Sequence, residues 1–392
     1  MQYNILSENN TSTVVAHYER PAMVADDGYQ TEADLERSLI EQLQRQGYEY
    51  AQIHNEDELI ANLRVKLEEL NNYRFTDNEW SSFFKTEIAS EGKGIIDKTR
   101  TIQTDFVKTL KCDNGEEKNI YLIKKDDVHA NRTQVINQYE VWNGKRPNRY
   151  DVSILVNGLP LVHIELKKRV VSIKEAFNQI NRYGRESFWA GNGLFEYVQI
   201  FVVSNGTQTK YYSNTTRDSH INEIKKGGNK NKPKTSNSFE FTSYWADASN
   251  QVLNDLVDFT ATFFSRHTLL NVLTRFCVLT EQDLLLVMRP YQIAATEALL
   301  NQIERAHNMK KQGTIDACGY VWHTTGSGKT LTAFKAAQLA TKYDFIDKVV
   351  FVVDRKDLDY QTMKEYDRFQ KGAANGNAST KILESQLKNP KC

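Results

Sequence analysis

Hydrophobic and polar positions in the middle of the chain follow two periods in succession. In the first, residues 150–168 read YDVSILVNGLPLVHIELKK, where apolar side chains such as Val162 and Ile164 alternate with polar ones. Alternation of this kind is typical of a β-strand, because successive side chains point to opposite faces. The dipeptide Asn157-Gly158 tolerates the positive φ angles of a tight turn. The stretch therefore predicts a β-hairpin.

The second period is helical. In residues 172–189 apolar side chains recur every three or four positions, at Ile173, Ala176, Phe177 and Ile180. An earlier segment, residues 31–50, has the same period and predicts an amphipathic helix. Thr31 is its expected N-cap. The apolar face of this helix is expected to carry Leu35, Leu39 and Leu43.

The same patterns predict elements elsewhere in the chain. Helices are expected within residues 56–90 and at Asn250–Phe264, the latter as a connector between domains. Residues 1–30 are polar and are expected to be extended. Residues 213–238 are rich in lysine and poor in apolar residues, which predicts a flexible basic loop. Strands are expected at Thr101–Lys108, Asn119–Lys125, Tyr197–Val203, Gln208–Tyr212, Gly319–Trp322 and Lys348–Val353.

Composition narrows the class of protein. The chain has 392 residues, 40% of them hydrophobic and 26% charged, which is typical of a globular protein with two or three domains. Lys+Arg and Asp+Glu both number 50, so contact with nucleic acid would depend on local patches. The four cysteines form no Cys-x-x-Cys pair, which favours a reducing cytoplasm over a disulfide framework. The sequence contains neither a signal peptide nor an apolar run long enough for a membrane span.

The hairpin carries the first candidate chemistry. Glu165 and Lys167 are expected on the same face of the second strand, and Asp151 lies across the turn from them. Two carboxylates can hold a divalent cation that activates water, and an ammonium group offsets the charge that develops on a phosphate. A charged face on a half-exposed strand is also common without any chemistry. This pattern alone therefore leaves catalysis and a solvated strand face both open.

The following helix adds Gln179 and Tyr183, one turn apart. With these two residues, the sequence resembles the RecB-like branch of the PD-(D/E)xK nucleases, whose signature Asp…Glu-x-Lys…Gln-x-x-x-Tyr is matched by Asp151, Glu165, Lys167, Gln179 and Tyr183. Tyr150 stands where the family name has proline. The resemblance implies a Mg²⁺ site at Asp151 and Glu165. It also implies a glutamate on an N-terminal helix, for which we favour Glu36 over Glu32.

The second candidate chemistry is a phosphate-binding loop. Residues 323–330 read HTTGSGKT and stand between an expected strand and an expected helix, which is the arrangement of such loops. Backbone N–H groups of a glycine-rich loop can surround phosphates. Lys329 would reach the β- and γ-phosphates of ATP, and Thr330 would bind Mg²⁺. The expected loop residues are Thr325, Gly326, Ser327, Gly328, Lys329 and Thr330.

Two segments around this loop indicate a motor and not a kinase. Residues 289–292, Arg-Pro-Tyr-Gln, resemble the Q-motif of superfamily 2 helicases, in which Gln292 would read adenine with Arg289 beside it. Residues 352–362, VVDRKDLDYQT, resemble a helicase segment that contacts the DNA backbone. His323 stands where the strict loop consensus has glycine, a departure that helicase-type loops tolerate.

Taken in order, these segments resemble the restriction (motor) subunit of type I restriction–modification enzymes. The resemblance implies an α/β protein: a PD-(D/E)xK nuclease domain with a mixed sheet flanked by helices, expected at residues 1–260, and part of a RecA-like P-loop domain at 261–392. It also implies Mg²⁺ and ATP as cofactors. The implied partners are double-stranded DNA and the methyltransferase and specificity subunits.

Three further expectations complete the interpretation. No Asp-Glu-x-His sequence follows Lys329, so we expect the N-terminal part of a larger subunit that does not hydrolyse ATP by itself. A RecB-like nuclease–helicase of DNA repair is the alternative enzyme, and the 352–362 segment disfavours it. A catalytically inert docking module is the alternative without chemistry, and the intact Asp151, Glu165 and Lys167 disfavour that.

Overall fold

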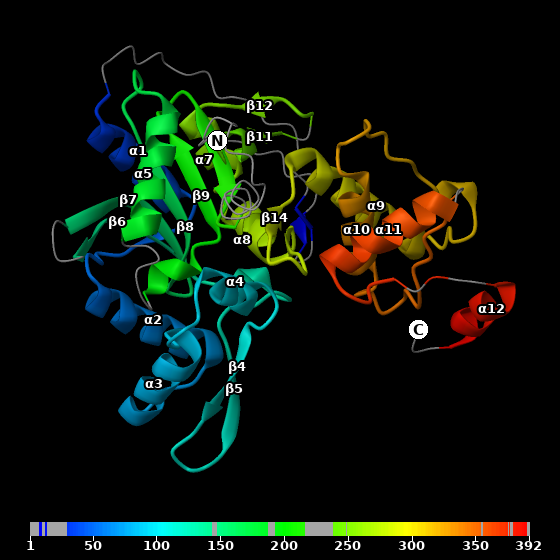
Figure 1. Ribbon diagram of the computed structural model, residues 1–392, viewed down its shortest axis with the longest axis horizontal. Helices are drawn as coiled ribbons and strands as arrows, with labels where there is room; N and C mark the ends of the chain where they lie inside the picture. Colours follow the sequence, from blue (N-terminus) through cyan, green and yellow to red (C-terminus); the bar gives the residue numbers. More distant parts are fainter. Residues whose placement is uncertain are drawn as a thin grey trace, which may run out of the picture. The chain divides into compact units, whose positions relative to one another are not determined.

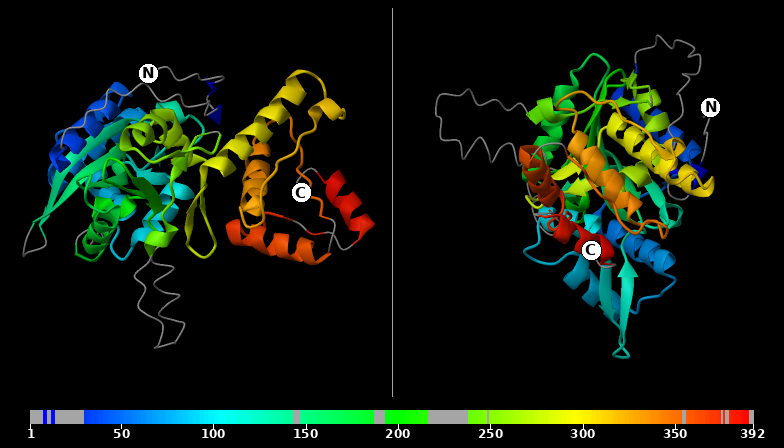
Figure 2. Two further views of the ribbon diagram at one scale, coloured as in Figure 1. Left: turned by 90° about the horizontal axis from the view of Figure 1, so that it is seen from above. Right: turned by 90° about the vertical axis from the view of Figure 1, so that its right-hand side faces the viewer.

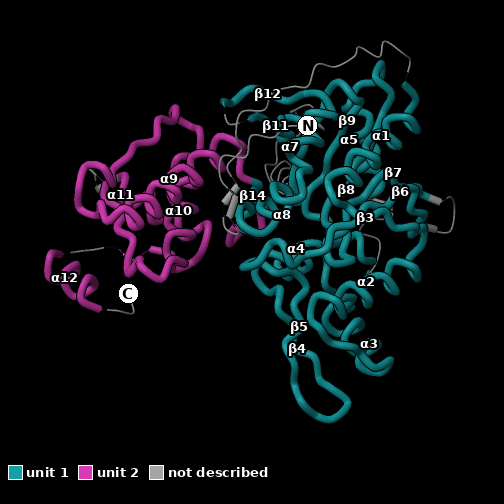
Figure 3. The backbone as a smooth tube through the Cα atoms, turned by 180° about the vertical axis from the view of Figure 1, so that it is seen from behind, with its two compact units in different colours: residues 1–279, 285–287 teal, residues 280–284, 288–392 magenta. Residues whose placement is uncertain are grey.

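The computed structural model describes residues 8–9, 12–13, 30–142, 147–186, 193–215, 238–247, 249–353, 356–374, 376 and 379–389. The chain divides into two compact units (Figure 3). Unit 1 contains residues 1–279 and 285–287, and unit 2 contains residues 280–284 and 288–392. Most of the expected N-terminal segment, residues 216–237 of the expected basic loop, and residues 354–355 lie outside the described residues.

Unit 1 is built on a six-stranded mixed sheet with the strand order β10-β9-β8-β7-β6-β3 (Figure 1). The β8–β9 and β3–β6 pairs are parallel, and the other neighbours are antiparallel. A mixed sheet with helices on it is the expected α/β class. The strands are β3 (Glu49–Tyr50), β6 (Thr133–Trp142), β7 (Pro147–Val156), β8 (Leu159–Leu166), β9 (Ile200–Ser204) and β10 (Thr209–Ser213).

The predicted hairpin is confirmed as β7 and β8. Its turn residues Asn157 and Gly158 have φ angles of 52° and 84°, which are the positive values of a two-residue hairpin turn. The Asn157 side chain donates to the carbonyl oxygen of Leu122 at 3.1 Å and to Oδ1 of Asn131 at 2.8 Å. The turn is therefore held by buried amide groups as well as by its backbone.

Helices cover both faces of the sheet, and every residue of β8 is buried as a result. Neighbouring residues of β10 show the two sides: Tyr212 packs on Phe177 of α5 (Ile173–Glu186), and Tyr211 packs on Phe259 of α7 (Leu256–Thr262). The helix α1 (Glu32–Arg45) lies beside α7 on the side opposite α5 (Figure 2). Thr31 caps α1 as predicted, by accepting the N–H of Asp34.

The other elements of unit 1 surround the sheet. They include the helices α2 (Glu56–Asn71), α3 (Asp77–Phe83), a π-helical turn (Phe84–Ile88), α4 (Ile95–Gln103) and α8 (Arg266–Thr274). Short 3-10 helices lie at Val128–Ala130, Leu194–Tyr197 and Ser238–Phe241. The paired strands are β1 (Glu8–Asn9) with β2 (Ser12–Thr13), β4 (Val107–Lys111) with β5 (Glu117–Tyr121), β11 (Trp245–Ala246) with β12 (Val252–Leu253), and β13 (Cys277–Leu279) with β14 (Leu285–Val287).

Several predicted boundaries are wrong. The expected strand Thr101–Lys108 begins inside α4, where Thr101 and Ile102 are buried as residues of the helix. The strand β4 starts only at Val107. The expected helix Asn250–Phe264 starts as β12, which pairs with β11, and becomes α7 only at Leu256. The helices α7 and α8 belong to unit 1, so the two compact units separate beyond the expected boundary at residue 260.

Unit 2 consists of the helices α9 (Pro290–Asn308), α10 (Lys329–Ala340), α11 (Lys356–Phe369) and α12 (Thr380–Lys388), with a 3-10 turn at Ile315–Ala317. Helix α10 follows the expected loop but already begins at Lys329, inside residues 323–330, and its Phe334 packs on Phe369 with ring centroids 5.2 Å apart. The expected strands at residues 319–322 and 348–353 are not strands. A strand requires a pairing partner, and neither segment is paired in the part of unit 2 that the structure describes.

Across the described part of the chain, none of the helices combines the length and the apolar character needed to cross a lipid bilayer.

Gly158 provides a test of how the hairpin meets α2. An added Cβ at Gly158 would lie 2.7 Å from the Cα atom of Leu63, whereas at Gly115, which has the same φ of +84°, it would meet nothing within 4 Å. We expect Gly115→Ala to cost about 1 kcal/mol through its backbone angle alone. Gly158→Ala should cost about 1–3 kcal/mol more through overpacking. Urea unfolding measures both losses, and equal losses would contradict the proposed close contact.

Candidate functional site

Asp151 lies just beyond the point where β7 and β8 stop pairing. The ladder between the two strands ends at the pair Val152–Ile164. Past this pair, Oδ2 of Asp151 accepts the backbone N–H of Leu166 at 2.8 Å. A carboxylate thus takes the hydrogen bond that the neighbouring strand would otherwise supply. This local separation of two central strands places Asp151 beside the end of β8.

Glu165 comes from the end of β8 and is completely buried. Its Oε2 lies 3.2 Å from Nε2 of His163. Its Oε1 is also buried and has no hydrogen-bond partner. The Lys167 ammonium lies 3.7 Å from that atom, which is within ion-pair range but longer than a hydrogen bond. One oxygen of a buried carboxylate is therefore left without a close partner.

The protonation of the two carboxyl groups reflects this environment. Burial, and then the charge of Glu165, raise the pKa of Asp151 to about 7. Burial raises the pKa of Glu165 to about 8, against the opposing effect of Lys167. Both charged forms are thus disfavoured near neutral pH, and a cation placed between the groups would stabilise them. Perturbed carboxyl groups of this kind are typical of functional sites.

His163 is a site residue to which the sequence did not assign a role. Burial lowers the pKa of His163 to about 4, so the ring is neutral at physiological pH. A neutral ring that donates from Nε2 to Glu165 must accept at Nδ1, where the hydroxyl group of Ser153 lies 3.1 Å away. The signal was the alternation of β8, which puts His163 on the same face as Glu165 two residues later.

Lys167 lies beside Glu165, just after the end of β8. Its Nζ donates to the carbonyl oxygen of Leu166 at 2.8 Å and is 4.0 Å from Oε2 of Glu32. The structure thus places Glu32, and not the favoured Glu36, near Lys167. The carboxylate of Glu36 instead accepts hydrogen bonds from the side-chain amides of Asn137 and Gln138 on β6. Glu36 lies one turn further along α1, so its side chain reaches β6 and not the end of β8.

Gln179 and Tyr183 lie one turn apart on α5, as predicted. Nε2 of Gln179 donates to Oη of Tyr183 at 2.6 Å, and Oη of Tyr183 donates to the carbonyl oxygen of Arg149 at 2.9 Å. Arg149 precedes Asp151 by two residues on β7. These hydrogen bonds connect α5 to the strand that carries Asp151.

The donor set can be tested against a divalent metal ion. Within the described ranges, no group of three or more His, Cys, Asp or Glu side chains is arranged to hold a metal ion. Mg²⁺ does not need such a cage, because it keeps several waters and takes only one or two protein carboxylates. The unpartnered Oε1 of Glu165, next to the Asp151 carboxylate, fits that requirement.

The expected phosphate loop adopts a conformation that needs its glycines. Gly326 and Gly328 have φ angles of 79° and 81°, and Gly328 is the N-cap of α10. A Cβ atom on Gly328 would also collide with the side-chain amide of Gln292. Nζ of Lys329 lies over the loop, 3.3 Å from the carbonyl oxygen of His323. Thr325, Ser327 and Thr330 lie in the same turn and helix start.

Gln292 is placed differently from the expectation that its amide reads adenine. Its Oε1 accepts the N–H of Arg289 at 2.9 Å, and its Nε2 donates to the carbonyl oxygen of Ser327 at 2.9 Å. The side chain is buried, so both ends of the amide are used to hold the phosphate loop against the start of α9. Arg289 itself is exposed at the N-cap of α9.

Comparison with known proteins bears on both sites. A family described as the N terminus of type I restriction enzyme R proteins matches residues 29–220, and the SWI2/SNF2 ATPase family matches residues 291–392. The EcoprrI type I restriction enzyme endonuclease subunit of Escherichia coli is 47% identical over 300 residues, which cover 76% of this chain and 90% of that protein. The chain belongs to the type I restriction enzyme endonuclease subunits.

Other endonuclease subunits of type I enzymes match more of the chain. One from Staphylococcus saprophyticus is 41% identical over 368 residues, which are 92% of this chain and 36% of that protein. A putative one from Methanocaldococcus jannaschii is 23% identical over 393 residues, 91% of this chain and 36% of that protein. This endonuclease subunit chain therefore spans about a third of the length of those two relatives.

Glu165 gives a prediction for the metal-free endonuclease subunit. Its pKa is higher in the folded chain than in the unfolded chain, so the stability it contributes is complete below about pH 4.5 and is lost as the pH rises through about 8. Glu165→Gln removes this loss. We expect the variant to exceed the wild type by roughly 1–3 kcal/mol in free energy of unfolding at pH 8.5, and by much less at pH 5.

Glu79→Gln is a control with the opposite pH dependence. Hydrogen bonds to Glu79, above all the one from the N–H of Thr76, lower the pKa of Glu79. The stability from Glu79 is present at neutral pH and is lost as the pH falls, so this variant should be weakened most at neutral pH. Denaturant unfolding at several pH values in EDTA measures both trends. A stability difference for Glu165→Gln that does not depend on pH would contradict the buried-carboxylate interpretation.

Proposed function

We propose that this subunit is a divalent-metal-dependent DNA endonuclease with its centre at Asp151, Glu165 and Lys167. The observation that carries the proposal is the unpartnered, fully buried Oε1 of Glu165 beside a second carboxylate of raised pKa. Burying a carboxylate whose charge is only partly offset costs stability, so the arrangement has a reason to exist where a cation or substrate uses it. An inert docking module would gain nothing from it.

Each residue has a distinct role in this proposal. Asp151 and Glu165 would hold Mg²⁺, and the Leu166 carbonyl oxygen, which accepts from Lys167, is a further candidate ligand. When bound, the ion would supply an activated water and polarise the scissile phosphate of double-stranded DNA. Lys167 directs its ammonium group to the charge that develops on the phosphate or the attacking oxygen. Its position between Glu165 and Glu32 keeps that group at the mouth of the site.

Two sets of hydrogen bonds keep the carboxylates in place. Nε2 of His163 lies 3.2 Å from Oε2 of Glu165, and the Ser153 hydroxyl group lies 3.1 Å from Nδ1 of the same ring, so the two contacts orient the ring beside the carboxylate. Gln179 and Tyr183 hold the Arg149 carbonyl oxygen and so fix the strand that presents Asp151. These are positioning residues, because their hydrogen bonds reach the carboxylates or the strand that carries them and not a reacting atom.

The second part of the proposal is ATP binding at residues 323–330. The positive φ angles of Gly326 and Gly328, the start of α10 at Lys329 and the tethering of the loop by Gln292 support it. Lys329 would exchange its carbonyl contacts for the β- and γ-phosphates, and Thr330 would bind Mg²⁺. Because the Gln292 amide is bound to the loop, the exposed Arg289 is the remaining candidate for a contact with the adenine base.

The assembled enzyme is the setting in which we expect these sites to act. As an endonuclease subunit of the type I class, the chain would work with methyltransferase and specificity subunits, cut DNA away from the recognition sequence and translocate DNA with ATP. Membership of that family favours this role over a RecB-like repair nuclease–helicase.

Metal binding gives the first test of the nuclease centre. Asp151→Asn and Glu165→Gln should each weaken Mn²⁺ binding to the isolated subunit at least about tenfold, because each removes a charged oxygen ligand. Lys167→Met should keep Mn²⁺ binding, while DNA cleavage by the assembled enzyme falls about 10²–10³-fold. Calorimetry and a supercoiled-plasmid assay measure the two effects.

Glu36→Gln is the matched control, because Glu36 lies on α1 but contacts β6. It should leave Mn²⁺ affinity unchanged. Unaltered metal binding in Asp151→Asn and Glu165→Gln would remove the nuclease assignment. Loss of binding in Glu36→Gln would instead restore Glu36 as a site residue.

Nucleotide binding is tested separately with a fluorescent ATP analogue. Lys329→Ala should weaken binding at least about tenfold, the size expected for a charge-assisted contact to phosphate. Lys342→Ala, an exposed lysine in the turn after α10, should bind as the wild type does. Equal affinity of the two variants would rule out the assigned loop.

A further inference from the structure

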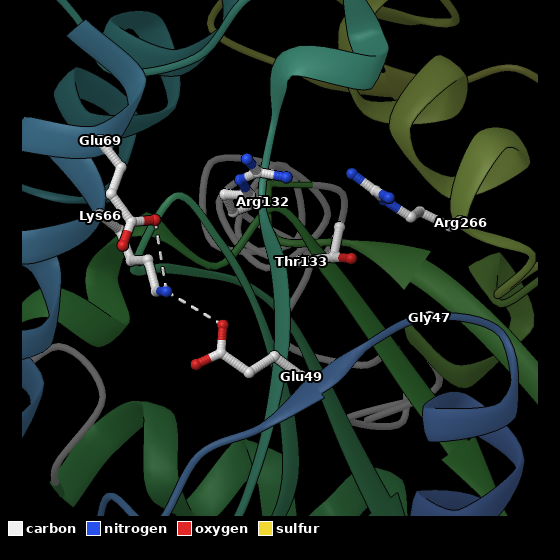
Figure 4. A pocket seen from close by; sticks show the side chains of 7 residues that line it. All are labelled: Gly47, Glu49, Lys66, Glu69, Arg132, Thr133 and Arg266. Atoms are coloured by element: carbon white, nitrogen blue, oxygen red, sulfur yellow. Dashed lines mark hydrogen bonds and ion pairs between the residues drawn. The ribbon is translucent and has the colours of Figure 1, made fainter. Parts of the chain in front are cut away.

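A pocket of about 410 Å³ lies at the β3 edge of the sheet in unit 1, and neither proposed site uses it (Figure 4). The start of β6, the segment around β3, the helix α2 and the start of α8 all contribute to its wall. The lining residues are Gly47, Glu49, Lys66, Glu69, Arg132, Thr133 and Arg266.

The two carboxylates that line the pocket are paired with a lysine that also lines it. Lys66 bridges Glu49 and Glu69, with Nζ to Oε2 distances of 3.0 and 3.4 Å. Oε1 of Glu49 also accepts from Nε2 of Gln134 at 3.3 Å. The two carboxylates are therefore engaged with a lysine that the same pocket supplies. In Figure 4 these three side chains form one group, away from the two arginines.

The opposite side has donors without acceptors. Oγ1 of Thr133 and Nε of Arg266 are buried and have no hydrogen-bond partner. Arg266 donates through Nη2 to the carbonyl oxygens of Asn131 and His129, at 2.7 and 3.4 Å, which are neutral groups that leave its charge uncompensated. Arg132 is exposed and makes no ion pair with any described residue. Figure 4 shows its guanidinium group directed toward that of Arg266, with Thr133 between them.

The backbone beneath these donors is fixed by the hairpin turn. The N–H of Arg132 donates to Oδ1 of Asn157 at 2.8 Å, and its carbonyl oxygen accepts the N–H of Asn157 at 2.8 Å. Asn157 also holds Asn131 through their side chains. Arg132, Thr133 and the carbonyl partners of Arg266 thus rest on a rigid, buried network, so little ordering is needed for the donors to act together.

We propose that this pocket binds a phosphate group between Arg132, Arg266 and Thr133. Its charged residues sum to one positive charge, from three cations and two carboxylates. A phosphate has enough acceptor oxygens for two guanidinium groups and a hydroxyl group together, and arginine forks match its geometry. The phosphate belongs either to a small ligand or to a DNA backbone. The proposal is independent of the metal centre and of the ATP loop.

The test uses the whole chain in EDTA and in a Lys329→Ala background, so that neither metal nor the proposed ATP loop contributes. Inorganic phosphate is titrated against chloride at equal ionic strength, and the apparent affinity is taken from the shift in Tm. Thr133→Val, which keeps the side-chain shape, and Arg132→Gln should each weaken phosphate binding about five- to tenfold. Arg74→Gln, an arginine whose side chain is 94% exposed elsewhere on unit 1, should have no effect.

A second arm distinguishes the two sources of phosphate. If DNA occupies the pocket, the same two variants weaken binding of a labelled duplex, and free phosphate competes with that duplex. If a small ligand occupies it, duplex binding is equal in all variants while the phosphate effect remains. The proposal is overturned if phosphate stabilises the Thr133→Val, Arg132→Gln and Arg74→Gln variants equally, or stabilises none of them. Arg266 is left unchanged because it also holds backbone carbonyl groups.

Discussion

A buried carboxylate without a full set of partners is the constraint on which unit 1 depends. Glu165 ends a central strand whose faces are both covered, so water cannot solvate its charge. Asp151 adds a second carboxylate where β7 and β8 separate. The surrounding groups offset this cost only in part, through His163 on one oxygen and Lys167 near the other. The remaining deficit is what a cation bound at the proposed site would offset.

The rest of unit 1 can be understood as support for that strand end. Helix α5 connects to β7 through Tyr183 and the carbonyl oxygen of Arg149, and α1 brings Glu32 to Lys167. At the other end of the same hairpin, Asn157 organises the turn and the segment before β6. One hairpin thus has the candidate metal site at one end and the candidate phosphate pocket near the other. Both depend on buried amide and imidazole groups that hold charged side chains in fixed positions.

In unit 2, the candidate site is formed mainly by backbone groups and not by side chains. Its loop depends on two glycines with positive φ angles, and Gln292 holds that loop against α9. The segments expected as strands on either side of α10 pair with no strand among the described residues, and they expose apolar side chains such as Trp322 and Val352. Local sequence is sufficient for a helix and its cap, whereas a strand exists only when a second strand supplies hydrogen bonds.

The sequence by itself determined the hairpin and the amphipathic helices, because period, turn chemistry and capping act over a few neighbouring residues. It also named candidate residues for both sites. It could not determine which glutamate of α1 reaches Lys167, that His163 supports Glu165, or that Gln292 is bound to Ser327. The first contact depends on how α1 is rotated against the sheet, the second on the side-chain conformations at the end of β8, and the third on how the loop folds against the start of α9. The pocket between Arg132 and Arg266 is the clearest case, since 134 residues of sequence separate two side chains that only tertiary packing brings together.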